Sequence, residues 1–442
     1  MTRIVFAKES DCEENPEGLD LRATLIPDHV KDYLASGFDV TIQAGLGEGI
    51  GYLDRMYELQ GATVQAYPDC YSDKDLVVKL KGPSAAEIAQ LSQDTTLFSM
   101  AHLYCFPERK RLLEAKDTRV IGMESVTQPY SPSAEYQQGI CAGASMNHQD
   151  LGEAPVVLVT PEADQRYLNG LLRAVMRYAG VPVRVSYLPS TAAKSGPTAG
   201  SGTAQLVVHG LRTELRTTDG QVVDISVDPA VTNCDHLSLL KEELGKSDRS
   251  IGQIREVGIG GARYGLDLWQ SMNSGQAPSV VILGYGNVSM GAFEHLRNEG
   301  VDFTILGRAQ TRKEALPGWL ADAQLIVNGA ETPGEKDYII TMANSDHHIA
   351  PGSVVIDLIG GSPYLRSPVE HFQWTTFLPE IHHEYNGHYY AGLWGWDMFY
   401  SMTDTAKEYS RRIRDILTGD QNYAQDLDRF VSDYAYAAQL GI

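Results

Sequence analysis

The sequence predicts an α/β protein built from two domains, with a cleft between them and a small inserted α/β module. Length is the first observation behind this prediction, since 442 residues exceed what one hydrophobic core usually supports. Second, apolar runs of strand length, such as TRIVFA and DLVVKLK, alternate with helical stretches over residues 1–126. Third, the same alternation returns over residues 279–361. Such alternation is typical of mostly parallel sheets covered by helices.

The composition excludes several classes of partner. Lys and Arg number 36 against 57 Asp and Glu, which gives a formal net charge of −21. Such a field repels phosphate backbones and anionic lipids, so we expect neither a nucleic acid nor a membrane as partner. The segment MTRIVFAKESDCEEN has no signal-peptide core, and the five scattered cysteines form no CxxC pair. We therefore expect a cytoplasmic protein with reduced thiols, and a homo-oligomer is compatible with the sequence.

A glycine turn follows the apolar strand SVVILG, and a helix and a second strand follow the turn. Gly284 permits the tight turn, and Gly286 lets the backbone approach a pyrophosphate, whose charge the helix N-terminus stabilises. Ser289 stands where the third glycine of such motifs usually stands. The unit predicts a Rossmann-like dinucleotide-binding domain with Gly284, Gly286, Asn287, Val288 and Ser289 at the cofactor.

The end of the second strand indicates which dinucleotide binds. NAD sites usually carry an Asp or Glu there, which accepts hydrogen bonds from the ribose hydroxyls. This chain has Gly-Arg-Ala-Gln-Thr-Arg-Lys at 307–313, with no carboxylate. Arg308, Thr311 and Arg312 are therefore assigned to a 2′-phosphate, and we expect NADP(H) to be preferred over NAD(H). The alternative is a solvated basic turn.

These signals divide the chain into three parts. Residues 1–130 are predicted to form a substrate (catalytic) domain, completed by helices within 380–442. Residues 250–378 are predicted to form the second Rossmann-like domain, which binds the dinucleotide. Residues 151–245 are predicted to be the inserted module, to which the sequence assigns no role. The turn-rich stretch 127–150 is expected to be a linker.

Three ionisable residues of the first domain lie in apolar surroundings at predicted strand ends or loops: Arg22 in LRATLIP, Lys81 in LVVKLKGP and His102 in LFSMAHLY. Sheets of this class place their sites at strand ends. Arginine offers a planar fork to a carboxylate, whereas lysine and histidine exchange protons. Each residue alone is also compatible with a core position or a solvated strand tip. Together they predict an active site that faces the cleft.

The fragments AKES, LRATLIP, GLGEGIGYLD, DLVVKLKGP, LFSMAHLY and IGMESV occur in the order seen in the alanine dehydrogenase and pyridine-nucleotide transhydrogenase superfamily. The chain resembles this superfamily over about 1–126 and 250–400. Within it, ILGYGNVSMGAF is most similar to N5-(carboxyethyl)ornithine synthase, and lysine-forming saccharopine dehydrogenase belongs to the same group. The resemblance implies that Arg22 binds a substrate carboxylate and that Lys81 and His102 are catalytic. It also assigns Glu124, in IGMESV, to substrate binding.

Two departures from the family pattern shape the expected reaction. Alanine dehydrogenases follow the late strand with an Asp-Gln-Gly-Gly turn, whereas VVIDLIGGSPYL has Asp357 within the strand and no aspartate in the turn. The loop expected to face the nicotinamide reads GLWGWDMFYS. Its bulky Trp394, Trp396 and Tyr400 indicate a remodelled pocket, and Trp396 is assigned to substrate binding.

We therefore expect NADPH-dependent reduction of an imine between an amino acid amine and a 2-oxo acid, giving an opine- or saccharopine-type secondary amine, or its reverse. One alternative is simple reductive amination of a 2-oxo acid with ammonia, and another is a catalytically silent nucleotide-binding module. Both enzymatic interpretations imply an amino acid and a 2-oxo acid as partners. No metal is expected, because His382, His383, Glu384 and His388 lack a recognisable ligand spacing.

Overall fold

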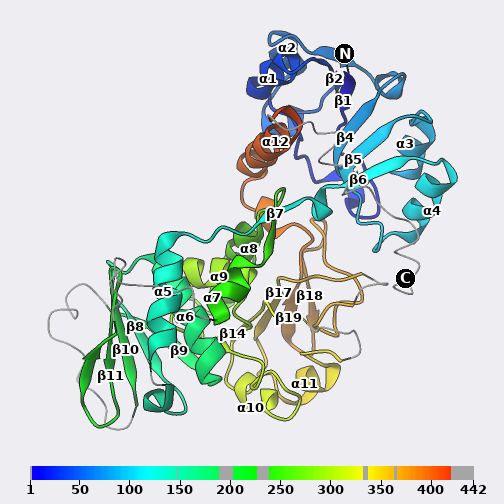
Figure 1. The fold of residues 1–442 in the computed structure, drawn as a ribbon. Coiled ribbons are helices and arrows are strands. Elements are labelled where there is room, and N and C mark those ends of the chain that lie inside the picture. Colours follow the sequence, from blue (N-terminus) through cyan, green and yellow to red (C-terminus); the bar gives the residue numbers. More distant parts are fainter. Residues whose placement is uncertain are drawn as a thin grey trace.

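A computed structural model describes residues 2–146, 148–188, 203–225, 238–331, 337–362 and 366–419. The described chain folds into two α/β lobes that meet near β7 (Thr127–Pro129) and α8 (Ile254–Met272), as Figure 1 shows. The predicted α/β class with Rossmann-like parallel sheets is confirmed. No described helix combines the length and apolar composition that a bilayer span requires.

The N-terminal lobe is built on a six-stranded parallel sheet in the order β3-β2-β1-β4-β5-β6. Its central strands are buried on both faces, which explains why their sequences are nearly continuous apolar runs. The strands are β1 (Thr2–Phe6), β2 (Phe38–Gln43), β3 (Thr63–Gln65), β4 (Leu76–Lys81), β5 (Thr96–Met100) and β6 (Arg119–Gly122). The helices around them are α1 (Val30–Ala35), α2 (Asp54–Glu58), α3 (Ala85–Gln90) and α4 (Pro107–Ala115).

Strands β4 and β5 carry the two predicted proton-handling residues at or just beyond their C-terminal ends. The two strands are parallel neighbours, and α3 connects them, as the sequence predicts. A capping box fixes the start of α3, because the Ser84 hydroxyl accepts from Glu87 N while the Glu87 carboxylate accepts from Ser84 N. Lys81 and His102 are thereby brought to one edge of the sheet.

The second lobe contains, among the described residues, an eleven-stranded sheet in the order β12-β11-β10-β8-β9-β15-β14-β16-β17-β19-β18. Helices α9 (Asn287–Asn298), α10 (Leu316–Leu320) and α11 (Met342–His347) belong to its nucleotide-binding half. The strands of that half are β14 (Val280–Leu283), β15 (Phe303–Leu306), β16 (Leu325–Asn328), β17 (Val354–Asp357), β18 (His382–Tyr385) and β19 (His388–Ala391). The second sheet thus extends beyond residue 378.

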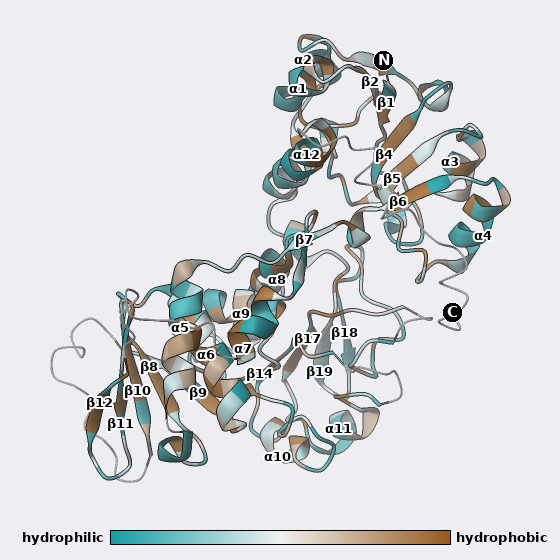
Figure 2. Cartoon of the chain, in the orientation of Figure 1, coloured by the Kyte–Doolittle hydropathy of each residue, from teal (hydrophilic) through white to brown (hydrophobic). Residues whose placement is uncertain are grey.

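The segment 151–245 extends this same sheet. Strand β9 pairs antiparallel with β15, and its Val183 and Val185 share one hydrophobic cluster with Phe303 and Ile305. Figure 2 shows brown apolar strands in this segment, and their buried side chains belong to the same hydrophobic cluster as those of the nucleotide-binding half. The helices and strands described within the segment are β8 (Val156–Val159), α6 (Gln165–Ala179), β9 (Val183–Tyr187), β10 (Gln205–His209), β11 (Arg212–Arg216), β12 (Val222–Asp224) and α7 (Ser238–Leu244).

Two expectations are wrong in this region. The stretch 127–150 is not simply a linker, because α5 (Ala134–Ser145) forms within it and packs closely on α6. Small residues allow this contact, since a Cβ at Gly139 would overlap the Tyr167 carbonyl oxygen of α6. The expectation of reduced thiols throughout is also wrong, because Cys141 of α5 is disulfide-bonded.

The C-terminal helix α12 (Met402–Thr418) returns to the N-terminal lobe, where Figure 1 shows it near α1. Its buried stripe, Ala406, Tyr409, Ile413 and Leu417, has helical spacing and joins the core beneath the first sheet. A second helix predicted after Gly419 lies outside the described residues.

Candidate active site

A cavity of about 860 Å³ lies between the lobes and is lined by residues of both. The first lobe contributes Arg22, Lys81 and His102, and the second contributes the Gly286–Val288 turn. Predicted site residues that lie far apart in the sequence therefore face the same cavity. The loops Leu358–Gly361 and Leu393–Asp397 complete its walls.

Arg22 is buried and paired with two carboxylates. Its Nε and Nη2 donate to Asp20 at 2.9 and 2.8 Å, and its Nη1 donates to Asp397 at 3.1 Å. Burial disfavours the ionised Asp20 carboxyl, but the Arg22 charge outweighs burial and lowers the pKa of Asp20. Nη1 and Nη2 each keep a further N–H that makes no hydrogen bond among the described residues, so Arg22 can still receive a carboxylate.

Lys81 lies at the end of β4 with its side chain 4% exposed. Its Nζ is 3.9 Å from Asp20 Oδ2 and 5.7 Å from the centroid of the Trp394 ring. Its backbone N–H donates to Glu9 at 3.1 Å, and its carbonyl accepts from Ser99 Oγ at 3.0 Å. The amine is therefore held on a rigid strand end that faces the cavity.

His102 has an unusual backbone conformation, with φ at +44°. A non-glycine residue in this left-handed region costs about 1–3 kcal/mol and persists only where its surroundings enforce it. The enforcing contact is Glu124 Oε1, which accepts from His102 N at 2.8 Å. Glu124, which the sequence predicts to bind substrate, is not among the residues that line the cavity, and its carboxylate holds the His102 backbone.

The His102 ring is oriented by Glu14. Nδ1 lies 3.2 Å from Glu14 Oε2, while Glu14 Oε1 accepts from Arg109 Nη1 at 2.6 Å and from Gly82 N at 2.7 Å. Burial opposes ionisation of Glu14, yet Arg109 and His102 lower its pKa to about 2. An ionised Glu14 fixes the proton on Nδ1 and leaves Nε2 as the ring nitrogen available to the cavity.

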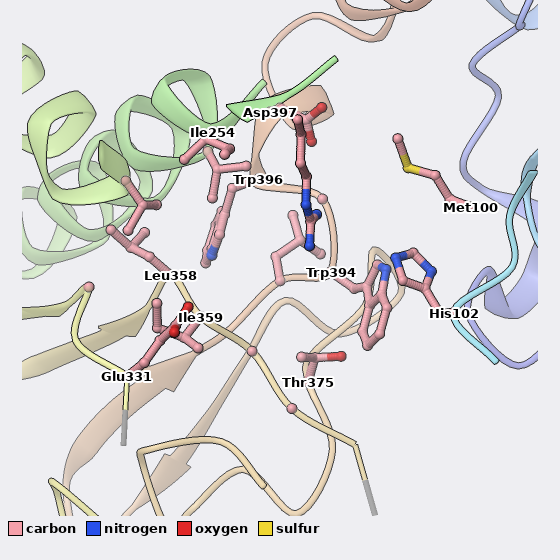
Figure 3. A pocket seen from close by; sticks show the side chains of 18 of the residues that line it. Met100, His102, Ile254, Glu331, Leu358, Ile359, Thr375, Trp394, Trp396 and Asp397 are labelled. Atoms are coloured by element: carbon pink, nitrogen blue, oxygen red, sulfur yellow. The ribbon is translucent and has the colours of Figure 1, made fainter. Parts of the chain in front are cut away.

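Two tryptophans of the Leu393–Asp397 loop have different positions. The Trp394 ring meets the His102 ring edge to face, with centroids 5.2 Å apart, as Figure 3 shows. Trp396, which the sequence assigns to substrate binding, also touches the cavity but is 1% exposed and donates from Nε1 to Asp357 O at 3.0 Å. Trp394 is therefore the aromatic wall beside the ionisable residues, while Trp396 mainly fills the core.

Asp357 occupies the end of β17, as the sequence predicts, and organises the loop that follows it. Its carboxylate accepts from Asn328 Nδ2 at 2.8 Å, Ser367 Oγ at 2.6 Å and Gly360 N at 3.0 Å. Burial raises its pKa, and no described basic side chain forms an ion pair with it. Asp357 thus shapes the cavity wall from behind.

The glycine turn after β14 fits a dinucleotide. Gly284 has φ +89°, and a Cβ there would lie 3.0 Å from Gly329 O, so the tight turn requires glycine. A Cβ at Gly286 would meet nothing, which leaves the N-terminus of the twelve-residue α9 open to a phosphate. Ser289 is fully buried, and a Cβ at Gly329 would overlap its hydroxyl. Ser289 therefore serves close helix–strand packing.

The residues predicted to clamp a 2′-phosphate lie on the turn after β15. Arg308 and Arg312 are exposed, Thr311 is half-buried, and none of the three lines the cavity. The Thr311 hydroxyl donates to Arg308 O at 3.4 Å. The turn is accessible to a ligand that extends beyond the cavity.

Sequence reasoning missed three acidic residues at the site: Glu14, Asp20 and Asp397. Asp20 precedes Arg22 by two residues, and this short spacing is a signal that could have suggested an ion pair. Asp397 contacts Arg22 across 375 positions, which no single-sequence pattern reveals. Glu14 lies in an acidic run that is typical of a solvated loop, yet its side chain is buried.

Comparisons with known proteins show which proteins this chain resembles. Residues 12–135, which include the four predicted site residues of the first lobe, match the family model described as alanine dehydrogenase/PNT, N-terminal domain. Alanine dehydrogenase of Halomonas elongata is 33% identical over 111 residues, 25% of this chain and 30% of that protein. NAD(P) transhydrogenase subunit alpha of Haemophilus influenzae is 28% identical over 105 residues, 24% of this chain and 20% of that protein. The matched part thus spans less than a third of either relative.

The fold of the whole chain has a counterpart as well. A solved L-alanine dehydrogenase superposes with a TM-score of 0.50 at 15% identity, covering 98% of this chain and 95% of that one. Fold and site together define a two-lobed α/β protein with a dinucleotide-type glycine turn facing a cluster of ionisable residues. Residues 12–135 resemble the N-terminal domain of the alanine dehydrogenase and pyridine-nucleotide transhydrogenase superfamily, which agrees with the resemblance carried by the sequence fragments.

Proposed function

We propose that this protein is an NAD(P)-dependent amino-acid dehydrogenase. The reaction converts an amino acid, oxidised cofactor and water into a 2-oxo acid, ammonium, reduced cofactor and a proton, and it runs in either direction. The observation that carries the proposal is that Arg22, Lys81 and His102 line one cavity with the Gly286–Val288 turn.

Each residue has a role that its surroundings support. Arg22 binds the substrate carboxylate through the N–H groups that Asp20 and Asp397 leave open. His102 accepts a proton at Nε2 from the water that attacks the imine carbon, and its Glu14 partner stabilises the resulting imidazolium. Lys81 hydrogen-bonds the carbinolamine oxygen and returns a proton to the departing ammonia.

The dinucleotide supplies the hydride acceptor, and the Gly284–Gly286 turn with Asn287 and Val288 would hold its pyrophosphate. Relatives of this chain include a protein named NAD(P) transhydrogenase, which supports a pyridine nucleotide. A preference for NADP(H) is part of the proposal, because the exposed turn after β15 carries Arg308 and Arg312 and no carboxylate between residues 307 and 313.

Simple deamination is proposed ahead of the opine-type reaction that the sequence alone suggests. Several of the relatives to which this chain is similar are named alanine dehydrogenases, and this supports simple deamination. The remodelled Trp394 wall concerns which amino acid fits, and does not by itself require a second substrate.

A substrate screen with the purified full chain tests the proposal. NAD⁺ or NADP⁺ is incubated with single amino acids, and with secondary amines of the opine type, while absorbance of the reduced nicotinamide is followed. We expect turnover with at least one free amino acid. Reduction only with secondary amines would favour the opine-type reaction, and reduction with neither would contradict the proposal.

A further inference from the structure

The segment 151–245, with the residues just after it, presents basic side chains to the cavity. Arg173 of α6, and Lys246 and Arg249 that follow α7, line the same space as Gly286, Asn287 and Val288. The family model ends at residue 135, so the match to it does not explain these residues. Their placement at the cavity indicates a binding role for this part of the chain, to which the sequence assigns no role.

Arg173 is attached to the glycine turn itself. Its Nη1 donates to the carbonyl of Tyr285, the residue between the two glycines, at 3.2 Å, and its guanidinium carbon lies 5.0 Å from the Tyr285 ring centroid. Its Nε and Nη2 donate to Glu243 at 3.1 and 2.8 Å. Glu243 is 1% exposed and also accepts from Lys246 Nζ at 2.5 Å. One buried carboxylate thus ties the segment's two cations beside the turn.

The local charge is positive although the chain is strongly acidic. Arg173, Lys246 and Arg249 carry three positive charges against one on Glu243, which leaves a net +2. Arg249 is exposed and forms no ion pair among the described residues. Two carboxylates, Glu331 and Asp397, also line the cavity, and Asp397 is already paired with Arg22. An anion that enters the cavity is therefore attracted to this wall.

Helix α6 also borders the turn after β15. Gln310 Nε2 donates to Gly180 O, the residue that ends α6, at 3.1 Å. A Cβ at Gly307 would lie 3.1 Å from Met176 Cε of α6. The segment therefore flanks both places where a Rossmann-type domain holds the pyrophosphate and the adenosine ribose.

We propose that the inserted segment and the residues just after it complete the nucleotide site, with Lys246 and Arg249 binding phosphate oxygens of the dinucleotide and Arg173 holding the glycine turn in place. This inference rests on the proposed function, because it concerns the same cofactor. The shared ligand chemistry is a phosphate group, either the pyrophosphate common to both cofactors or the 2′-phosphate of NADP(H) alone.

Cofactor binding by the full chain tests the inference without requiring turnover. NADH and NADPH are titrated separately, and nicotinamide fluorescence gives each Kd for the native protein and for Lys246→Gln/Arg249→Gln. The matched control is Arg177→Gln/Lys241→Gln, which removes two positive charges from the same segment at residues that do not line the cavity. Unfolding midpoints verify that all three proteins are folded.

We expect the cavity-side variant to raise Kd by about tenfold or more, since charge-assisted hydrogen bonds are strong, and the control to change Kd by less than about threefold. Equal weakening of NADH and NADPH binding identifies the pyrophosphate as the group that Lys246 and Arg249 bind. Weakening of NADPH binding alone identifies the 2′-phosphate as that group. An unchanged Kd, or equal effects of variant and control, would overturn the inference and leave the proposed function intact. A native protein that binds neither cofactor would contradict the proposed function and this inference with it. Should the double variant not fold, Arg249→Gln at its exposed position carries the test, with a rise of about threefold expected.

Discussion

The two walls of the cavity hold their positive charges in different ways. On the wall of the N-terminal lobe, buried carboxylates fix the cations, as Asp20 fixes Arg22 and Glu14 fixes Arg109 and the His102 ring. On the opposite wall, buried Glu243 holds Arg173 at the glycine turn, whereas Lys246 is 38% exposed and Arg249 is exposed. Desolvated pairs hold atoms in fixed positions and are costly to break, whereas exposed charges attract a ligand and are screened by salt. The first wall suits bond-making chemistry and the second suits phosphate recognition.

The largest effect is expected at the reaction wall. Lys81→Met removes the amine that exchanges protons while keeping the length and apolar part of the side chain. Turnover should fall by ~10²–10⁴-fold, the range of positioned acid–base groups, with cofactor Kd unchanged. Lys31→Met, at an exposed position on α1, is the control. Near-native turnover by a folded Lys81→Met protein would remove Lys81 from the mechanism.

Glu14→Gln should come next, because it breaks a buried ion pair with Arg109. The unfolding free energy at pH 7 should fall by about 3 kcal/mol, as measured by urea denaturation. The folded pKa of Glu14, about 2, lies below the ordinary value of 4.5, so the unfolded chain binds more protons between these values. The stabilisation is therefore present above pH 4.5 and is lost as pH falls toward 2.

The difference between native and Glu14→Gln proteins should accordingly shrink below pH 4.5. Glu13→Gln, one residue away and exposed, should match the native protein at every pH. A Glu14→Gln protein as stable as the native one at pH 7 would show that the buried pair does not stabilise this wall.

Trp394→Ala tests the aromatic boundary between the walls. Removing a ring that contacts both Lys81 and His102 opens space next to the substrate carbon. The kcat/KM for larger amino acids should therefore rise relative to the kcat/KM for smaller ones. We expect the ratio of kcat/KM values to change by about tenfold. Trp374→Ala, whose ring contacts Phe106 and does not line the cavity, should leave the ratio unchanged. Equal ratios in all three proteins would mean that Trp394 does not select the substrate.

The smallest effect is expected on the exposed turn after β15. Arg308→Ala/Arg312→Ala should weaken NADPH binding by about threefold to tenfold and leave NADH binding nearly unaffected. The effect is small because exposed charges are well screened. Lys313→Ala on the same turn is the control. Native protein with equal affinity for both cofactors would contradict the proposed NADP(H) preference.

Patterns within short stretches of sequence predict those parts of the fold and site whose structure depends on residues close together in the chain. The apolar runs of β4 and β5 and the glycine turn at Gly284 each appear where periodicity and turn chemistry place them. Contacts that depend on distant segments could not be predicted, such as Asp397 with Arg22 and the pairing of β9 with β15. Helix α5 was missed because its small residues resemble a linker until α6 packs against them.

The central claim is that one cavity brings an amino acid and a dinucleotide together for direct hydride transfer. Incubating the full chain and oxidised cofactor with an amino acid deuterated at Cα, followed by mass spectrometry of the cofactor, tests it most directly. We predict that the reduced cofactor carries one deuterium and that Lys81→Met slows its formation over many turnovers by ~10²–10⁴-fold. Reduced cofactor without deuterium, or none with any amino acid, would contradict the account.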